Sequence, residues 1–492
     1  MSPFARIKRF GQDDSGGILL LGAMSMVLLI GMVGVIYDIG RLSATHSELQ
    51  DFADSVSLTA ASELDGQPDA ITRAQSAANT LTAGHQTFAS GAQTLVASDV
   101  IELTFYRPNS EGKFSREAAL ETTDPRVARY VQAQVSDHTI LAGLSRVLGR
   151  TEDTNVGARA VAGFALEVCD IAPVAVCLPS VSFDARTQIG STLELDTSVN
   201  LGSLLPGNLA VVDTLTSALD GLGVCAGILG NQLSACLLAA REPKTACIGQ
   251  GGLKLDLNIN GSDLLSSLNT RFDEFGGIAS GLVGNPAFSA APNILSGLTS
   301  GGGVCDALDL SNLTGTDADI RLPLDDCLVF GGCNVQGNGD WTAGRQAYID
   351  AHYDGTDPHP NANTRFKFYQ AEVAASGTIP APASLLESVG GLVGGVVGGL
   401  LGGSSRPTPK LCAPQENLDT TRRLMVVAGI DCSGGGPGVT ASAPPVQEFF
   451  EVFALGPGEN GKLAVEITAC LGKGCGNGNL DTDVIDVVRL VE

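Results

Sequence analysis

The sequence has little aromatic material and no excess of positive charge. Only 5% of its 492 residues are Phe, Trp or Tyr, with a single Trp, so the material for a large hydrophobic core is thin. Twenty-nine basic residues stand against 53 acidic ones, and the formal net charge is −24. This balance argues against nucleic acid as a partner and against docking on an anionic lipid surface.

The motifs of common enzyme classes are also missing. The sequence has no HExxH, no GxSxG, no Gly-x4-Gly-Lys-Ser/Thr and no CxxC. His352, Asp354, Asp357 and His359 could converge on a metal ion, but no helix or strand pattern fixes their side chains. Residues 477–486 lack the spacing and the Gly of a calcium loop. We therefore predict that the protein is not an enzyme and has no cofactor, with an envelope metalloenzyme at 352–359 as the least favoured alternative.

An uncharged apolar run extends from Gly17 to Tyr37. As a helix it reaches about 31 Å, which is the thickness of a bilayer's hydrocarbon core. Its Leu, Ile and Val residues contribute roughly −3 to −7 kcal/mol to insertion. The run is longer than the apolar part of a signal peptide, and it lacks the early Glu of a pilin-type segment. We predict a permanent anchor that crosses the lipid bilayer once.

The orientation of this anchor follows from the flanking charges. Arg6, Lys8 and Arg9 precede the run, whereas Asp13 and Asp14 count for little in the positive-inside rule. The N-terminal tail is therefore predicted to stay in the cytoplasm, and the chain beyond Asp38 to lie on the other side of the membrane.

Cysteine is absent from the first 168 residues, and the even number of twelve follows, which suits an oxidising compartment. Zinc-bound or free thiols are less favoured because no CxxC occurs. Pairs close in sequence are Cys169/Cys177, Cys327/Cys333, Cys412/Cys432 and Cys470/Cys475, but the connectivity stays open. The candidate disulfide residues are Cys169, Cys177, Cys225, Cys236, Cys247, Cys305, Cys327, Cys333, Cys412, Cys432, Cys470 and Cys475.

Helical spacing continues beyond the apolar run, as a seam of about three heptads. This seam could bind a partner helix or pack on the protein's own outer domain. At the membrane boundary, Asp38 and Arg41 are three residues apart and could pair locally or contact a partner's span. The seam consists of Leu42, His46, Leu49, Ala53, Val56 and Ala60.

Further elements are predicted from periodicity. Residues 69–88 and 139–149 have helical patterns, and residues 99–106, 130–136 and 156–166 alternate as strands. Residues 422–432 have strand character, and 449–457 with 462–470 form a predicted hairpin. The Gly-rich stretch 389–405 is interpreted as a linker rather than a second span, because nearly half of it is Gly and a second span would place later cysteines in a reducing compartment.

These patterns define an α+β protein. A single transmembrane helix continues into a stalk helix and a small α+β module, and a Gly- and Cys-rich, mostly β or irregular extracytoplasmic region follows. The predicted segments are a cytoplasmic tail (1–16), the anchor (17–37), the stalk helix (38–65), the α+β module (66–166), the Cys-containing region (167–384), the Gly-rich linker (385–410) and a β-rich C-terminal segment (411–492).

The stretch 6–66 resembles the N-terminal region of TadG-like Flp pilus-assembly proteins. In that family a basic tail and one span lead into an Asp-x-Gly-Arg turn of helix and a Leu-Gln…Ala-Asp…Ala-Ala helix. Residues 130–163 and 422–432 also look like parts of longer TadG-related chains. The positions that carry the resemblance are Asp38, Gly40, Arg41, Leu49, Gln50, Ala53, Asp54, Ala60 and Ala61.

This resemblance implies a part in building or anchoring the tight-adherence (Flp) pilus at the bacterial inner membrane, with the bulk of the chain in the periplasm. Other Tad membrane proteins would be its partners. Some family members carry a von Willebrand A domain with a DxSxS metal motif, but DCSGG at 431–435 lacks the second Ser. The leading hypothesis is a non-catalytic, single-span assembly factor, and the alternative is an exported adhesin or minor pilus component.

Overall fold

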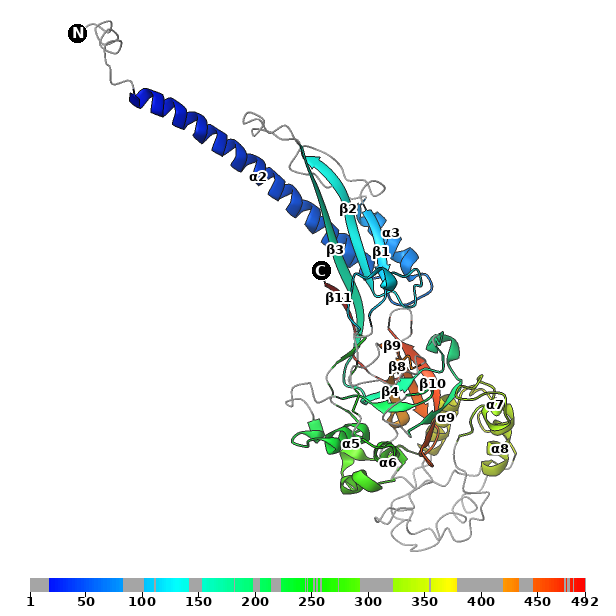
Figure 1. The fold of residues 1–492 in the computed structure, drawn as a ribbon. Coiled ribbons are helices and arrows are strands. Elements are labelled where there is room, and N and C mark those ends of the chain that lie inside the picture. The colour runs from blue at the N-terminus through cyan, green and yellow to red at the C-terminus, as the bar shows by residue number, and fades with distance from the viewer. Residues whose placement is uncertain are drawn as a thin grey trace, which may run out of the picture. The chain divides into compact units, whose positions relative to one another are not determined.

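The computed structural model divides into two compact units (Figure 1). Unit 1 comprises Met1–Arg107, Arg116–Phe164 and Val488–Glu492, and unit 2 comprises Pro108–Ser115 and Ala165–Val487. The structure describes residues 17–491 except 83–100, 110–111, 141–152, 181, 198–203, 214–222, 244, 246, 251–252, 254, 257–258, 273, 293–321, 354, 378–418, 433–445, 473–474, 476–477 and 481.

In its described residues, unit 1 combines two helices with an antiparallel sheet. The helices are α2 (Gly17–Ala61) and α3 (Ala70–Thr82), and the sheet order is β1-β2-β3-β11. The strands are β1 (Ile101–Tyr106), β2 (Tyr130–Ile140), β3 (Thr154–Val168) and β11 (Val484–Leu490). Val131 of β2 lies between Phe105 of β1 and Ala162 of β3, so the buried face of the sheet is continuous across these strands.

The second half of α2 packs on this unit. Leu49, Phe52, Val56 and Ala60 are fully buried or nearly so, and they recur at intervals of three or four residues. On a helix that spacing places them on one face. The helix contacts β2 and α3. A single apolar stripe therefore fixes the helix to its sheet.

Unit 2 is built on a six-stranded sheet in the order β5-β10-β9-β8-β4-β6. All its pairs are antiparallel except β4 with β8, which run parallel. Its main core includes Val176, Phe450, Val452 and Val465 from three of these strands. The strands are β4 (Val174–Cys177), β5 (Thr192–Asp196), β6 (Leu209–Val211), β8 (Leu424–Ile430), β9 (Val446–Ala454) and β10 (Lys462–Leu471).

Short helices surround this sheet. They are α5 (Asn231–Ala239), α6 (Gly261–Asn269), α7 (Asp326–Val329), α8 (Thr342–His352) and α9 (Arg365–Gly377), and a short strand β7 (Ile248–Gly249) pairs with the end of β3. A second core holds Trp341, which directly precedes α8, together with aromatic residues of α9 such as Phe368 and Tyr369. A third, small core surrounds the Cys225–Cys236 disulfide.

The β9–β10 hairpin confirms the prediction made for residues 449–470. Ala454 of β9 lies opposite Val465 of β10. At the tip, Asn460 and Gly461 have φ of +52° and +80°, and Glu459 and Lys462 exchange both backbone hydrogen bonds at 2.9 Å. Positive φ at both central residues is the requirement of a type I′ turn, which Asn-Gly meets at little cost.

The other helices and strands predicted from the sequence are confirmed in part. The helix expected at 69–88 is present as α3 up to Thr82, and the strands expected at 99–106, 130–136 and 156–166 are present as β1 from Ile101, β2 and β3. Residues 83–88 and 99–100 of these predictions lie outside the described residues. The helix expected at 139–149 is wrong for Thr139 and Ile140, which extend β2 because they pair with Asn155 and Thr154. The rest of that helix, and the Gly-rich stretch 389–405, lie outside the described residues.

Candidate functional site

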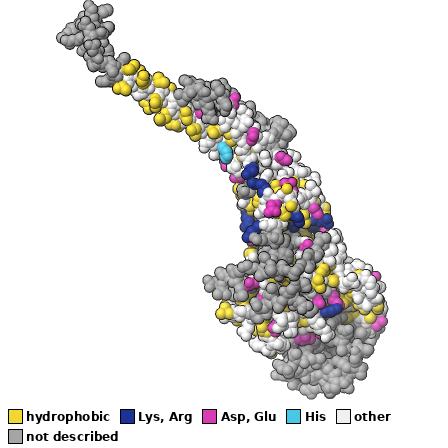
Figure 2. All heavy atoms as spheres, viewed as in Figure 1, with side chains coloured by type: hydrophobic (Ala, Val, Ile, Leu, Met, Phe, Trp, Pro, Cys, Tyr) yellow, Lys and Arg dark blue, Asp and Glu magenta, His cyan; other side chains and the backbone are white. Residues whose placement is uncertain are grey.

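The first half of α2 exposes its apolar side chains (Figure 2). From Leu20 to Ile39 its large apolar side chains are exposed, Leu21 by 70% and Val35, the least exposed, by 37%. The described chain contains one helix that is long and apolar enough to cross a bilayer, and it is this one, with a mean hydropathy of 2.3 in its most apolar window. Exposed Leu, Ile, Val and Met in such number are unfavourable in water and favourable in hydrocarbon.

The boundary residues come where the exposed apolar segment ends. Asp38 and Arg41 are half-buried, and Gly40 between them is exposed, with no atom within 4 Å of where a Cβ would lie. Four residues beyond Arg41, the buried Thr45 begins the stripe that packs on the sheet. The predicted boundary motif therefore marks the change from an apolar exposed surface to tertiary packing.

The candidate seam packs on the protein's own unit. Leu49, Ala53, Val56 and Ala60 are fully buried, while Leu42 is half-buried and His46 is exposed. The four buried residues have their contacts inside unit 1, where α2 contacts β2 and α3. Leu42 precedes the packed part of the helix, which begins at Thr45.

A side chain between the seam residues links α2 to the sheet through a hydrogen bond. Gln50 Nε2 donates to the carbonyl oxygen of Arg159 in β3 at 3.1 Å and to Asp54 Oδ1 at 2.8 Å. Gln50 and Asp54 belong to the family-like positions named above. Their polar side chains thus orient the stalk helix on β3, which gives a structural reason for an amide and a carboxylate one turn apart.

The disulfides of the described chain follow from strand register. Cys177 and Cys432 are joined because β4 and β8 run parallel with Cys177 opposite Ile430. Cys169 and Cys247 are joined because Val168 of β3 lies opposite Ile248 of β7, and the two cysteines form the next antiparallel pair. The candidate pairs Cys169/Cys177 and Cys412/Cys432 are therefore wrong.

Three disulfides close short loops. Cys327–Cys333 and Cys470–Cys475 occur as their spacing suggests, and Cys225–Cys236 joins two residues that the sequence left unassigned. Cys305 and Cys412 lie outside the described residues.

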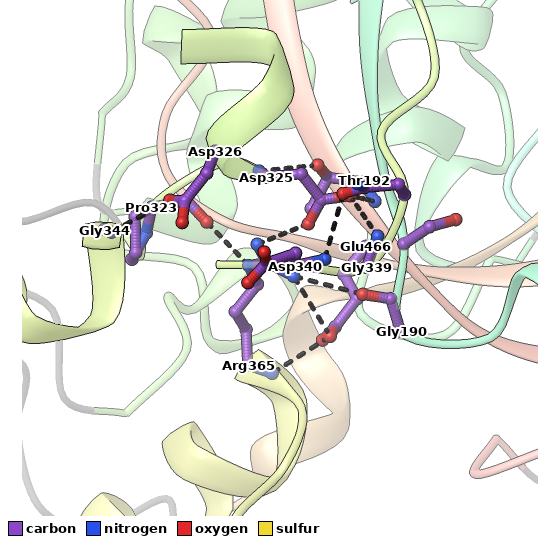
Figure 3. A network of polar contacts seen from close by, with 12 residues as sticks. Gly190, Thr192, Pro323, Asp325, Asp326, Gly339, Asp340, Gly344, Arg365 and Glu466 are labelled. Carbon is purple, nitrogen blue, oxygen red and sulfur yellow. Dashed lines mark hydrogen bonds and ion pairs between the residues drawn. The ribbon is translucent and has the colours of Figure 1, made fainter. Parts of the chain in front are cut away.

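A buried network of charged side chains joins α9 to the sheet and to the loop before α7 (Figure 3). Arg365 and Asp325 are both inaccessible to solvent, and Arg365 Nη2 donates to Asp325 Oδ1 at 2.6 Å. The guanidinium also donates to the carbonyl oxygens of Pro323 at 2.6 Å and Gly190 at 3.1 Å, and it lies over the ring of Trp341. Every side of this buried cation has a partner, as burial requires.

The second carboxylate oxygen of Asp325 accepts from the backbone. Thr192 N donates to it at 3.0 Å and Gly339 N at 2.8 Å. A Cβ at Gly337 would lie 1.9 Å from this oxygen, so the approach of the 335–339 loop requires glycine there. The network thus fixes β5, a loop, and α9 around one arginine.

The side chain of Glu466, in β10, caps the N-terminus of α9. Its carboxylate oxygens accept from the backbone N–H groups of Arg365 at 2.9 Å and Phe366 at 2.7 Å, which are free donors at the start of a helix. Burial raises the pKa of Glu466 to about 7, while the charge of Arg365 and these hydrogen bonds act in the opposite direction. The sequence predictions missed Arg365, Asp325 and Glu466, since no local pattern distinguishes a buried charge from an exposed one.

The loop that was considered as a metal site has structural partners. Asp357 Oδ2 pairs with Arg345 Nη2 at 2.9 Å, the same nitrogen donates to the carbonyl oxygen of His359, and the His359 ring meets the Phe368 ring edge-on at 5.2 Å. Within the described ranges no cluster of three His, Cys, Asp or Glu residues could hold a metal. Asp354 and the side chain of His352 lie outside what is described.

A groove of about 630 Å³ lies beside α6 in unit 2. Its polar lining is already engaged: Asn269 Nδ2 donates to Glu274 at 2.9 Å and to the Gly458 carbonyl at 3.0 Å, and Thr197 Oγ1 donates to the Gly461 carbonyl at 3.0 Å. No nucleophile with an adjacent base lines this groove.

Residues 16–63 match the family model of putative Flp pilus-assembly TadE/G-like proteins. The match confirms the resemblance of the N-terminal region and covers both the exposed and the packed half of α2. It indicates a role in Flp pilus assembly. No curated protein and no solved structure shows significant similarity to the chain.

Proposed function

We propose that this protein is a non-catalytic, single-span membrane component of Flp pilus assembly or anchoring. Its N-terminus lies in the cytoplasm, and a disulfide-stabilised scaffold or binding region lies on the other side of the inner membrane. Other Tad membrane proteins are its partners in this proposal. The TadE/G-like match of residues 16–63 supports the pilus role.

One observation carries the proposal: a single continuous helix has two different surroundings. The 45 residues of α2 run without a break from an apolar exposed segment into a stripe buried on the β-sheet. A helix that merely delivered the chain for export would have no need to continue into the folded unit. Removal of the span by cleavage anywhere after Thr45 would also strip buried residues from the core of unit 1.

Disulfides support the proposed location of unit 2. Such bonds persist outside the cytoplasm, and the described ones all lie beyond residue 168. The three Lys and Arg residues before the span support the same orientation.

The test separates the two halves of α2. A chain in which a cleavable secretory signal peptide replaces residues 1–39 keeps the whole buried stripe and still reaches the oxidising side of the membrane, so it should fold, appear in the soluble fraction and fail to support pili. A matched control replaces residues 17–37 by an equally long Leu/Ala segment, which should restore membrane attachment. Normal pili from the untethered chain, or a mature polypeptide that begins downstream of Arg41 in wild-type cells, would contradict the proposal.

A further inference from the structure

A lobe of unit 2 differs in charge from the rest of the chain. We define the Cys225 lobe as residues 223–240 together with 275–292. No Asp, Glu, Lys, Arg or His occurs in the stretches 221–240 and 275–305, although the chain as a whole carries 53 acidic and 29 basic residues. Two uncharged stretches that are separated in sequence thus form one part of the fold.

The lobe has its own small core. The disulfide Cys225–Cys236 joins a short 3-10 turn (Gly223–Cys225) to α5, and Leu233, Leu237 and Phe288 pack around it. The second stretch contributes the 3-10 turns Gly277–Leu282 and Pro286–Phe288, the first of which contacts α5. Figure 1 shows α5 at the margin of unit 2. The disulfide and this core hold the outer surface of the lobe in one conformation.

That outer surface is apolar. Val224, Leu229 and Val283 are exposed by 51%, 66% and 47%. Ile228 and Leu282, their immediate neighbours in sequence, both pack on the lobe's core, so the exposed residues belong to the same small structure. One exposed leucine needs no explanation. Several on an uncharged, cross-linked lobe are typical of a contact surface.

The charge of the chain decides which partner fits. Two copies of a protein with a net charge of −24 repel each other at most approaches, and salt screens this repulsion only beyond about 8 Å. A face without any ionisable side chain avoids close contacts between like charges. In a twofold contact the same patch of each copy meets the other, so two neutral lobes can meet without bringing like charges together.

We propose that the Cys225 lobe is the contact surface between two copies of this chain. The exposed apolar side chains of one lobe pack on those of the other. The lobe is small compared with the roughly 800 Å² per partner of a standard interface, so the contact is weak for free molecules. The inference therefore rests on the proposed anchor, which confines the copies to one membrane and raises their effective concentration.

The experiment uses the full chain in cell membranes. Two differently tagged copies are expressed together, each with a photoactivatable phenylalanine analogue at Leu229 or, separately, at Val283. Irradiation should give an adduct that carries both tags. The matched control places the same analogue at Ile189, which is 51% exposed but lies outside the lobe, and its doubly tagged adduct should be at least about tenfold weaker.

A second variant tests the chemistry. Leu229→Asp combined with Val283→Asp places carboxylates on both faces and should reduce crosslinking from a neighbouring lobe position, Val224, by about tenfold, while Ile189→Asp should leave it unchanged. Equal adduct yields at Leu229 and Ile189, no doubly tagged adduct, or adducts with a different protein or with lipid alone would overturn the inference. Membrane fractionation of the same samples keeps the two proposals apart, because failure of the anchor places the protein in the soluble fraction, whereas failure of the lobe contact leaves it in the membrane.

Discussion

Unit 1 and unit 2 stabilise thin hydrophobic cores in different ways. The described part of unit 1 has no disulfide and relies on one helix stripe packed against a sheet, with a half-exposed cation, Arg73, pairing with Glu63 and Asp65 at the corner between α2 and α3. The described part of unit 2 contains five disulfides and fully buried ions such as Arg365 and Glu466. The spacing of a stripe is set by neighbours along the helix, whereas cross-links and buried ions need particular residues from distant segments to meet. The two units should therefore respond differently to reduction, mutation and pH.

The largest expected difference concerns the disulfides. Cys177–Cys432 closes a loop with a sequence separation of 255, whereas Cys327–Cys333 has a separation of 6. In the chain-entropy model, loss of the first costs about 5 kcal/mol and loss of the second about 2 kcal/mol. The single Trp, Trp341, is buried in unit 2, so urea unfolding of the detergent-solubilised chain followed by its fluorescence reports this unit. Equal destabilisation by the two Cys→Ala double variants would contradict the prediction.

The second prediction compares two arginines. Arg365→Met leaves Asp325 buried without its cation and should lower the free energy of unfolding of unit 2 by about 4 kcal/mol. Arg73→Met removes a half-exposed ion pair from unit 1 and should cost about 1 kcal/mol or less. Trp341 fluorescence measures the first change, and pulse proteolysis of unit 1 measures the second. A small effect of Arg365→Met would show that the buried network adds little to the stability of unit 2.

The third prediction compares the two halves of α2. Leu49→Ala should destabilise unit 1 by about 3 kcal/mol, because Leu49 is fully buried. Leu29→Ala, on the exposed half, should leave the unfolding of unit 1 within about 0.5 kcal/mol of wild type. Pulse proteolysis in detergent gives both values. Equal losses would mean that the exposed half also packs on protein.

The fourth prediction concerns the pH dependence of unit 2. Burial raises the pKa of Glu466 from 4.5 to about 7, so folding favours its protonated form. This contribution to stability is fully present below pH 4.5 and is lost as the pH rises to about 7. The urea midpoint reported by Trp341 should therefore fall over that interval, and Glu466→Gln should flatten the slope. Glu372, whose pKa burial also raises to about 7, should contribute in the same direction.

Particular residues show how far the sequence could be interpreted. Leu49, Ala53, Val56 and Ala60 were identified as one helix face, but only the structure showed that they are buried inside unit 1, where α2 contacts β2 and α3. The β9–β10 hairpin was predictable because alternation and the Asn-Gly turn act over a few residues. Strand β11 was assigned to a C-terminal segment, whereas the sheet of unit 1 recruits it beside β3.

Properties that depend on neighbouring residues can be predicted from the amino-acid order: the long apolar helix, its change to a narrow stripe, the strands and the confinement of cysteine to the later part of the chain. Which cysteines pair and which charges are buried depends on the three-dimensional fold. Cys177 meets Cys432, and Arg365 meets Asp325, because strand register and helix docking bring distant segments together. Periodicity reports the local conformation of the chain, whereas these contacts depend on how its separate segments close around a common core.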